Sequence, residues 1–410
     1  MSDISIHDRM GQANTPVAPL CLLVHPSAQA MGEKVNSWIR EFRKDDNNEY
    51  KDEPMYIGYY KDDYRTELSS IRFETGEGRV VLMDSVRGKD VYILVDITNY
   101  SITYEMNGFT NHMSPDDHFQ DLKRVISAVN GTAHRINVIM PFLYEGRQHH
   151  RNKRESMDAA IMYKELCDLG IKNFITFDAH DPRIQNADPL VDFSNFSSPY
   201  QFLRTLIHNE KDLTVDKDHI VVIAPDEGAL DRTVYFANVI GADTGMFYKR
   251  RDYSKIVGGK NPIVAHEFLG TDLNGKDAII IDDMVSSGGS ILDTSRQLKL
   301  NMHAKRVFLC TTFGLFTDGL APFDEAYEKG YFDRLVTTNL TYLPEELLQR
   351  EWYAQADMSK YMATIIDFIN HDSGITNMST SNEKIHNILK KMNLNQQTVA
   401  EERQLDMTEF

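Results

Sequence analysis

The chain has 410 residues, 41% of them hydrophobic, which is enough for two packed domains. Its 61 acidic and 44 basic residues give a net charge of −17, which disfavours passive binding to DNA, RNA or an anionic membrane. The three cysteines, Cys21, Cys167 and Cys310, are far apart, which excludes a disulfide framework and a metal knuckle and favours buried, unreactive thiols. Because the net charge is strongly negative, an anionic substrate must bind at local clusters of Arg and Lys.

The N-terminal segment, residues 1–17, is polar and lacks the apolar core of a signal peptide. No later apolar run approaches the roughly 20 residues that a membrane-spanning helix needs. We therefore expect a soluble cytoplasmic enzyme, with neither nucleic acid nor a membrane as a partner.

Apolar, mostly β-branched segments recur along the chain and predict strands. They are Pro19–Val24, Val91–Ile97, Arg135–Met140, Asn173–Phe177, His219–Ala224, Asp277–Ile281, Lys305–Thr311 and Arg334–Thr338. Because most of them lack polar alternation, they are typical of parallel strands that are buried on both faces. Helical stretches lie between them, among them Asp117–Ala128, Met157–Leu169 and Ser290–Leu300. Alternating strands and helices predict βαβ units and a parallel sheet.

A polar stretch interrupts this series at Asp192–Ser198, and we place the main domain boundary near it. Both halves of the chain are series of strands, loops and helices. From about Ser379 the chain becomes rich in Asn, Gln and Glu, which predicts a mobile tail. The sequence therefore predicts an α/β protein with two domains.

The sharpest signal for chemistry follows the predicted strand Asp277–Ile281. Two carboxylates, Asp282 and Asp283, come directly after it, and a loop of small residues then leads into a helix. Gly and Ser let backbone N–H groups close on an anion, and the helix N-terminus adds partial positive charge. The carboxylates beside such a cradle suit sugar hydroxyls or Mg²⁺. The alternative is an ordinary turn with Ser290 as the helix N-cap, which leaves the run of small residues unexplained.

Two basic clusters stand out in this acidic chain. Lys249, Arg250 and Arg251 end a strand and enter a Gly-containing stretch, Val257–Lys260. Three adjacent cations suit the charge that develops on a transferred phosphate group, although a solvated run of charges is the alternative. Arg147 opens the second cluster, whose guanidinium groups suit bidentate contacts with phosphate oxygens.

Three further residues, His180, Asp226 and Phe73, are candidates for a ligand site. His180 ends a strand with Asp178 two residues before it, and Asp226 follows the strand His219–Ala224. A carboxylate at such a strand end suits a metal–phosphate site. Each residue also has a structural interpretation: a lone histidine is more often structural, Asp226 can cap the next helix, and Phe73 can be a core aromatic rather than a platform for a base.

Together, these motifs make the chain resemble the ribose-phosphate diphosphokinases. The loop after Asp283 resembles the phosphoribosyl-diphosphate loop that this family shares with the phosphoribosyltransferases, and the other motifs resemble the diphosphokinases alone. Those other motifs are Phe73 to Glu77 with Ser85–Asp90 after it, Arg147-Gln148, Phe177–His180, Pro225–Ala229 and Lys249–Arg251. The resemblance extends, in order, from roughly residue 20 to residue 370.

The resemblance implies a reaction in which the diphosphate group of Mg·ATP is transferred to the 1-hydroxyl of ribose 5-phosphate. The products are 5-phosphoribosyl-1-diphosphate and AMP. By resemblance, Asp282 and Asp283 bind the ribose hydroxyls. The resemblance also implies that the 5-phosphate is bound by the loop residues Ser286, Ser287, Gly288, Gly289 and Ser290.

The remaining roles also follow from the resemblance. Lys249 and Arg251 are the implied catalytic residues, and His180 and Asp226 are the implied ligands of Mg²⁺, the expected cofactor. The residues implied to bind ATP are Phe73, Thr75, Glu77, Arg147, Gln148 and Asp226.

The resemblance further implies the architecture, an α/β fold of two tandem phosphoribosyltransferase-like domains, each a mainly parallel sheet flanked by helices. The first domain is expected at residues 18–197 and the second at 198–345. A helix over 346–375 is expected to pack back on the first domain, followed by a mobile tail at 376–410. A homo-oligomer, hexameric or based on dimers, is implied, with adenine bound across a subunit boundary.

The sequence departs from the family pattern at several places. Ser286, Ser287 and Ser290 stand where common members carry Asp-Thr and a final Thr, which resembles a branch that is less strict about the nucleotide donor. Glu155 replaces an arginine that the main class uses for allosteric phosphate and ADP, and the Ser-Tyr-Leu-Phe-Ser ending of that class is absent, so we expect phosphate to activate weakly or not at all. Extra segments lie near Arg40–Thr66, near Met106–Asp116 and in the tail.

Three alternative functions stay open at this point. The chain can be a phosphoribosyltransferase, which needs the loop but not the Arg147-Gln148 pair, or a non-catalytic regulatory relative of an active enzyme. The third alternative is diphosphate transfer to another ribose phosphate derivative, which the extra segments would admit.

Overall fold

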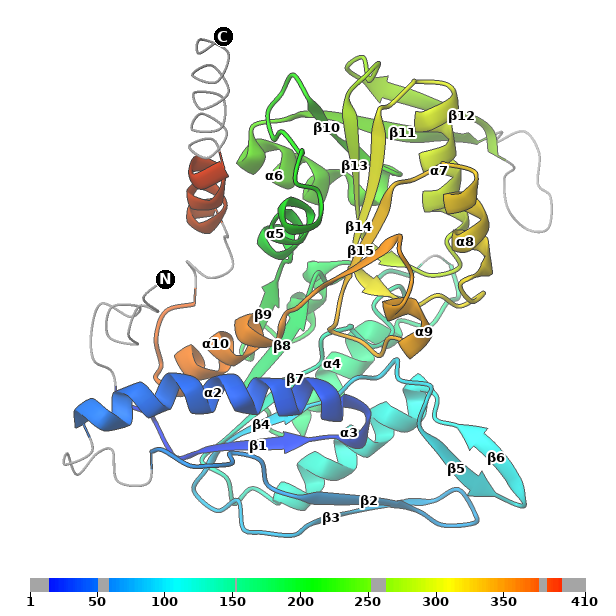
Figure 1. Cartoon of the computed structure of the whole chain (residues 1–410). Coiled ribbons are helices and arrows are strands. Elements are labelled where there is room, and N and C mark those ends of the chain that lie inside the picture. The colour runs from blue at the N-terminus through cyan, green and yellow to red at the C-terminus, as the bar shows by residue number, and fades with distance from the viewer. Residues whose placement is uncertain (1–14, 51–58, 152, 252–262, 376–381, 393–410) are drawn as a thin grey trace. The chain divides into compact units, whose positions relative to one another are not determined.

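The computed structural model describes residues 15–50, 59–151, 153–251, 263–375 and 382–392, and it divides into two compact units (Figure 1). Unit 1 comprises Met1–Ser197, Asn339–Tyr342 and Asp357–Ser379. Unit 2 comprises Ser198–Thr338, Leu343–Ala356 and Thr380–Phe410. Each unit contains its own sheet, so the α/β class and the two sheet-and-helix domains that the sequence predicts are confirmed.

Unit 1 is built on a parallel sheet of five strands in the order β1-β4-β7-β8-β9. The strands are β1 (Leu20–Val24), β4 (Asp90–Leu94), β7 (Arg135–Ile139), β8 (Asn173–Phe177) and β9 (Asp192–Phe196). The first four correspond to predicted strands. The fifth corrects one expectation, because we interpreted Asp192–Ser198 as a break in the strand–helix series. The domain boundary that we placed near this segment agrees with the division between the units at Ser197 and Ser198. Its polar residues are tolerated because β9 is an edge strand with β8 on one side only.

Two pairs of helices cover the faces of this sheet. α3 (Pro115–Val129) and α4 (Asp158–Asp168) share one hydrophobic core with β1, β4 and β7. On the other face lie α2 (Gln29–Tyr50) and α10 (Ser359–Asn370), which pack against each other (Figure 1). Their contact includes a buried ion pair in which Arg43 Nη2 lies 3.0 Å from Asp367 Oδ1. Helix α10, far along the chain from α2, therefore completes unit 1.

Two small antiparallel hairpins also belong to unit 1 (Figure 1). One consists of β2 (Leu68–Arg72) and β3 (Gly78–Leu82), and the other of β5 (Thr103–Met106) and β6 (Phe109–His112). We predicted neither hairpin. Their strands are short, half-buried in β2 and β3 and more exposed in β5 and β6, so they lack the fully buried apolar runs that reveal core strands.

Unit 2 contains a sheet of seven strands in the order β12-β11-β10-β13-β14-β15-β16. All neighbouring pairs are parallel except β11 and β12, which are antiparallel. The strands are β10 (Ile220–Ala224), β11 (Asp243–Arg251), β12 (Ile263–Gly270), β13 (Asp277–Val285), β14 (Arg306–Gly314), β15 (Arg334–Thr338) and β16 (Tyr353–Ala356).

The central strands of unit 2, β10, β13, β14 and β15, are largely buried on both faces, as their continuous apolar runs predict. Ile279 and Ile280 are neighbours in β13, yet they belong to different hydrophobic clusters because successive side chains point to opposite faces. Ile280 packs with α7 (Gly289–Leu300) and α8 (Ala321–Glu328), and Ile279 packs with α5 (Pro199–Asn209) and α6 (Leu230–Ile240).

The expectation of one helix over residues 346–375 is wrong. The segment contains the end of α9 (Glu345–Leu348), then β16, then α10. Residues Trp352 and Tyr353 are buried in the core of unit 2, and β16 adds a parallel strand to β15. Within this segment, residues up to Ala356 belong to unit 2 and those from Asp357 belong to unit 1, where α10 packs on α2.

Part of the segment that we expected to be mobile is structured. Residues 382–392 form a helix, and Ile385 is fully buried in the hydrophobic cluster that contains residues of α5 and α6. The hydroxyl of Tyr235, on α6, donates a hydrogen bond of 2.8 Å to Asn382 Oδ1. This helix therefore extends the core of unit 2.

Truncating Ile385 should destabilise unit 2. We expect Ile385→Ala to lower the free energy of unfolding by about 2–4 kcal/mol, because a fully buried isoleucine side chain is lost and a cavity remains. Urea-induced unfolding measures this change. His386→Ala is the matched control, because His386 is exposed on the same turn. Equal unfolding free energies for the two variants would contradict the packing of this helix.

No helix among the described residues is long and apolar enough to cross a membrane. The three cysteines are unpaired, and Cys21 and Cys310 are buried. Burial raises the pKa of the Cys167 thiol to about 11, and it also raises the pKa of Cys21 and Cys310. These thiols are therefore poor nucleophiles at neutral pH.

Candidate active site

The carboxylate pair Asp282-Asp283 lies inside β13 rather than after its end. We expected the strand to stop at Ile281, but it continues to Val285 because β14 runs beside it and pairs as far as Gly314. On the opposite side, β10 pairs only as far as Ile280. The two carboxylates therefore lie beyond the end of β10, where that side of β13 has no strand neighbour.

The loop after β13 has the backbone geometry of an anion cradle. Gly288 is the N-cap of α7 with φ +88°, a left-handed conformation that favours glycine, and no side chain caps the helix there. A Cβ atom on Gly288 would lie 2.4 Å from Cζ of Phe323, so any larger residue also meets a core ring. The uncapped N-terminus of α7 therefore presents backbone N–H groups and partial positive charge to an anion.

A second loop braces this cradle. The backbone N–H of Thr317 donates to the carbonyl of Ser286 at 3.1 Å, and the N–H of Leu315 donates to that of Val285 at 2.9 Å. The hydroxyls of Ser286 and Thr317 lie 3.4 Å apart. Thr317 could not be identified from the sequence, because it lies in the loop that follows a different strand, β14.

Arg232 is the cation closest to the carboxylate pair in the described contacts. Its Nη1 atom lies 3.5 Å from Oδ1 of Asp283 and 3.9 Å from Oδ1 of Asp282. The same Nη1 atom is buried and has no hydrogen-bond partner within the described part of the chain. The arginine is thus near enough to compensate charge, and it keeps an unused donor.

The electrostatics of the pair follow from this arrangement. Burial, and after it the neighbouring Asp283, raise the pKa of Asp282 well above its usual range, while Arg232 lowers it. Two adjacent carboxylates resist simultaneous ionisation, and a nearby guanidinium favours their charged forms. We did not predict Arg232 from the sequence, although it is the only basic residue in the segment that forms α6.

Asp226 occupies the turn between β10 and α6. Its Oδ1 atom accepts a hydrogen bond of 3.0 Å from the N–H of Gly228 and so caps a short 3-10 helix, Glu227–Ala229. Asp226 therefore has the capping role that we considered from the sequence. The carboxylate is partly exposed beyond the end of β10.

The backbones of Lys249 and Arg251 end β11, opposite His266 and Ile263 of β12. The register of this pair shifts between Arg250 and Arg251. Their side chains and the whole stretch Val257–Lys260 lie outside the described residues. Their catalytic role stays a prediction.

In unit 1, Phe73, Thr75 and Glu77 occupy one tight turn between β2 and β3. Phe73 donates its N–H to the carbonyl of Glu77 at 2.9 Å, and its own carbonyl accepts from Gly76 at 2.8 Å. The hydroxyl of Thr75 donates to Oε2 of Glu77 at 3.0 Å. The Phe73 side chain is 48% exposed, so it is not the core aromatic that we considered as an alternative.

Two further predicted residues of unit 1, Arg147 and Gln148, lie in an exposed turn after β7. The adjacent residue His149 connects this turn with the end of β8, because its ring lies 5.4 Å from that of His180 and its Nε2 lies 3.4 Å from Oδ2 of Asp181. Arg183 lowers the pKa of Asp181 to about 2, and His149 acts in the same direction. The structure therefore brings the Arg147-Gln148 turn and His180 together within unit 1.

The donors present fit Mg²⁺ only if a substrate supplies further ligands. Among the described residues, no group of three or more His, Cys, Asp or Glu side chains is arranged to hold a metal ion. Mg²⁺ usually keeps several waters and binds through one or two carboxylates together with substrate phosphates. The partly exposed carboxylate of Asp226 suits that mode better than an all-protein cage does.

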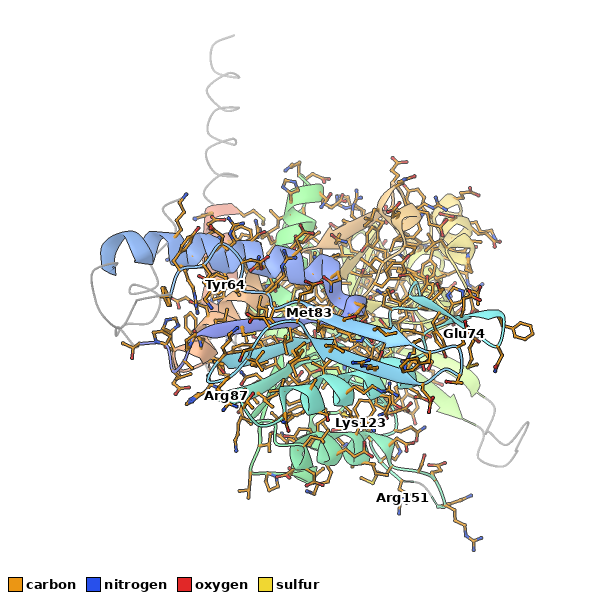
Figure 2. All side chains as sticks on the ribbon, turned by 90° about the horizontal axis from the view of Figure 1, so that it is seen from below. Tyr64, Glu74, Met83, Arg87, Lys123 and Arg151 are labelled. Atoms are coloured by element: carbon orange, nitrogen blue, oxygen red, sulfur yellow. The ribbon has the colours of Figure 1, made fainter. Side chains whose placement is uncertain are left out.

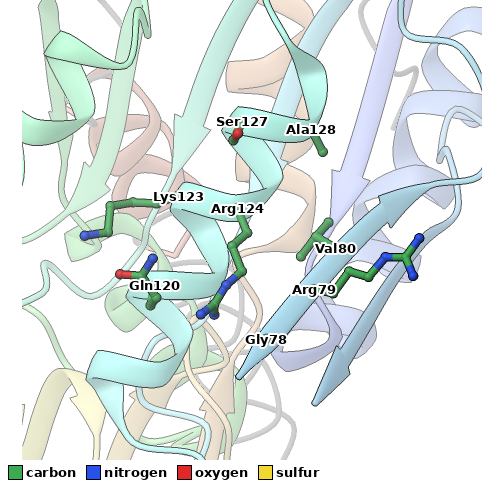
Figure 3. A pocket seen from close by; sticks show the side chains of 8 residues that line it. All are labelled: Gly78, Arg79, Val80, Gln120, Lys123, Arg124, Ser127 and Ala128. Atoms are coloured by element: carbon green, nitrogen blue, oxygen red, sulfur yellow. The ribbon is translucent and has the colours of Figure 1, made fainter. Parts of the chain in front are cut away.

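A surface cavity of about 410 Å³ lies between β3 and α3 (Figure 3). The basic side chains Arg79, Lys123 and Arg124 line it. Two of them are already engaged, since Arg124 pairs with Asp121 at 2.6 Å and Lys123 pairs with Glu165 at 3.0 Å. None of the predicted ligand residues lines this cavity, and we assign it no substrate.

Comparisons with known proteins agree on one family. Residues 60–170 match the N-terminal domain of ribose phosphate pyrophosphokinase, and residues 201–339 match the phosphoribosyl transferase domain. A ribose-phosphate pyrophosphokinase from Staphylococcus epidermidis is 27% identical over 318 residues, which cover 73% of this chain and 89% of that protein. One from Aquifex aeolicus is 26% identical over 278 residues, which cover 67% and 79%.

Among solved structures, the phosphoribosylpyrophosphate synthetase from Mycobacterium smegmatis is similar to this chain with a TM-score of 0.65. The likeness covers 87% of this chain and 100% of that protein at 20% identity. At this identity the likeness shows the fold, which agrees with the two sheets described above.

Proposed function

Because the chain belongs to the ribose-phosphate pyrophosphokinase family, we propose that it transfers the diphosphate group of ATP to the 1-hydroxyl of ribose 5-phosphate. The products are 5-phosphoribosyl-1-diphosphate and AMP. In this reaction the hydroxyl oxygen forms a bond to the β-phosphorus and loses its proton, and the bond from the β-phosphorus to the oxygen of AMP breaks.

The observation that carries this proposal is the cradle at the end of β13. Gly288 takes a left-handed conformation at the uncapped N-terminus of α7, directly after a pair of carboxylates. A dianionic phosphate suits the N–H groups of Ser286 to Ser290, and carboxylates accept hydrogen bonds from vicinal hydroxyls. A sugar that carries both groups, such as ribose 5-phosphate, matches this order of donors and acceptors.

The residues that we assign to the nucleotide follow from the family. The exposed ring of Phe73 offers a face on which adenine can stack, and Thr75 and Glu77 present polar groups from the same turn. Arg147 and Gln148 are exposed in their own turn, where the guanidinium suits phosphate oxygens. Asp226 is assigned to ATP and, with His180, to Mg²⁺.

In such a transfer the protein contributes mainly by positioning the substrates and stabilising charge. Mg²⁺, when bound with the phosphates of ATP, would offset their negative charge. The cradle holds the sugar by its 5-phosphate, and Asp282 and Asp283 orient the ring. We propose that Lys249 and Arg251 stabilise the charge that develops on the diphosphate as it transfers.

Further parts of the proposal rest on the family. We propose a homo-oligomer, hexameric or based on dimers, with a cytoplasmic location. Glu155 stands where the main class has an arginine for allosteric phosphate, so control by phosphate and ADP is not part of the proposal.

Incubation with Mg²⁺, ATP and ribose 5-phosphate tests the proposed reaction directly. We expect release of AMP in equal amount to the phosphoribosyl product, because diphosphate and not a single phosphate is transferred. Separation of the nucleotides by ion-exchange chromatography measures AMP and ADP. Ribose without its phosphate is the matched control, and it should give no AMP because it cannot occupy the cradle.

Two results would contradict the proposed reaction. Release of ADP would mean that a single phosphate is transferred, as in an ordinary kinase. Absence of any nucleotide product over a range of donors and phosphate concentrations would favour a phosphoribosyltransferase or a non-catalytic relative.

A further inference from the structure

The β5–β6 hairpin contacts the turn that carries Phe73, Thr75 and Glu77. The N–H of Asn107 donates a hydrogen bond of 3.1 Å to the carbonyl of Glu74, in the middle of that turn. A Cβ atom added to Gly76 would lie 2.6 Å from Sδ of Met106, so Met106 packs directly on the turn. Figure 2 shows Glu74 beside this hairpin.

A third contact joins the same two hairpins at their strands. The guanidinium carbon of Arg72, the last residue of β2, lies 5.5 Å from the ring centroid of Tyr104 in β5. The same arginine lies 3.1 Å from Asp121 of α3 and is largely buried. Arg72 therefore connects the β5–β6 hairpin both to the β2–β3 hairpin and to the core helix of unit 1.

The β5–β6 hairpin has its own well-defined geometry. Asn107 and Gly108 form its two-residue turn with φ +52° and +80°, the combination that a type I′ turn requires. At its base, the N–H of Met113 donates to the carbonyl of Ile102 at 2.8 Å. An isolated two-stranded hairpin is at best marginally stable, so contacts with a second hairpin stabilise both.

The turn between β2 and β3 has little to hold it in place by itself. Phe73, Glu74, Thr75 and Glu77 are all exposed, and exposed turns open easily. Gly76 adopts φ +88°, and its N–H closes the turn on the carbonyl of Phe73. Of the contacts described for this turn, those with Asn107 and Met106 are the ones that come from outside its own hairpin.

We propose that the β5–β6 hairpin is a positioning element for the nucleotide, which holds the Phe73–Glu77 turn in the conformation that binds the adenine base. This inference rests on the proposed function, in which Phe73 stacks on adenine. A turn that is ordered before binding loses less conformational entropy when the ligand binds. The hairpin therefore sets the affinity for ATP and leaves the sugar site in unit 2 unchanged.

A shortened variant tests this role. In it, Thr103–His112 are replaced by Asn-Gly, so that Ile102 and Met113 flank a new two-residue turn and keep their mutual hydrogen bond. We expect the Kd for ATP to rise by about tenfold or more, while the KM for ribose 5-phosphate changes by less than about twofold. Amide hydrogen exchange at Phe73 and Gly76, measured without ligand, should become faster.

Two point variants support the comparison. Met106→Ala removes the side chain that packs on Gly76, and it should weaken ATP binding in the same direction by about threefold. Because it leaves the hairpin in place, Met106→Ala tests the same contact even if the shortened chain does not fold. Phe109→Ser is the matched control, because Phe109 is 73% exposed at the same tip, and it should bind ATP as the unaltered chain does.

Several outcomes would overturn the inference. Unchanged exchange at Phe73 and Gly76 means that the hairpin does not hold the turn, and faster exchange with unchanged ATP affinity means that the turn does not control binding. Weaker binding by Phe109→Ser means that the hairpin contacts the nucleotide directly instead. If the unaltered chain binds no ATP, the proposed function has failed, whereas equal binding by the unaltered and shortened chains refutes the inference alone.

Discussion

Gly288→Ala is expected to lower kcat/KM for ribose 5-phosphate by about 10²-fold or more, a loss of roughly 2.7 kcal/mol of transition-state stabilisation. Two costs combine at this position. An L-residue at φ +88° is strained by about 1–2 kcal/mol, and the new Cβ would lie 2.4 Å from the Phe323 ring. The loop must shift to relieve this contact, and its N–H groups then no longer converge on the 5-phosphate. Steady-state kinetics with varied ribose 5-phosphate measure the effect.

Two other glycines provide controls for this variant. Gly289→Ala adds a Cβ in the same loop, where the nearest atom is 3.9 Å away, and we expect a change of less than about threefold. Gly319→Ala introduces a similar left-handed strain at φ +75° with no atom within 4 Å, so it reports the strain alone. If Gly288→Ala were no worse than these two, the cradle would not depend on its left-handed cap.

Arg232→Met is expected to reduce activity at neutral pH by about 10²-fold and to move the acid limb of the kcat/KM profile to higher pH. Burial and Asp283 already raise the pKa of Asp282, and Arg232 opposes them. Removing the guanidinium therefore raises this pKa further, and Asp282 stays protonated over a wider range of pH. If the ionised pair binds the ribose hydroxyls, activity should partly recover as the pH is raised.

The stability of the same variant should depend on pH in a defined direction. The folded-state pKa of Asp282 is raised above its unfolded value, so protonated Asp282 favours the folded state below the unfolded pKa. That contribution is lost as the pH rises through the folded pKa. Without Arg232 the ionised pair is uncompensated, so the Tm of Arg232→Met should fall, relative to the unaltered chain, as the pH rises.

A second substitution separates charge from packing in this variant. Adding Asp283→Asn removes one of the two like charges that lie near Arg232, so part of the lost Tm should return. Superimposable pH profiles for Arg232→Met and the unaltered chain would contradict the proposed ion-pair role. Failure of Asp283→Asn to restore stability would indicate that Arg232 acts through packing.

The sequence predicted the central strands of both sheets because their residues form continuous apolar runs. β8 and β15 begin and end where we expected, at Asn173–Phe177 and Arg334–Thr338. The strands that escaped prediction depend on neighbours far away in the chain. β9 is polar and is recognisable only beside β8, and β16 interrupts a helical pattern because β15 offers a free edge.

The candidate site shows the same division. The cradle could be predicted because the carboxylates, the glycines and the helix start are consecutive in the chain, so local chemistry reveals them. Arg232 could not, because its place beside Asp283 depends on β10 pairing no further than Ile280. The contact of Met106 with Gly76 likewise joins two separate hairpins, and no local sequence pattern predicts that they lie close together.

The ion pair between Arg43 and Asp367 constrains the order in which unit 1 folds. Arg43 is fully buried between α2 and α10, where it donates hydrogen bonds to Asp367 and Asn370. During synthesis, the first strands and helices of unit 1 leave the ribosome long before residue 367 is made. Until then α10 is missing, so Arg43 stays in water on the surface of α2 and lacks both partners. Unit 1 therefore cannot complete its core until α10 has been made, which follows the synthesis of all the strands described for unit 2.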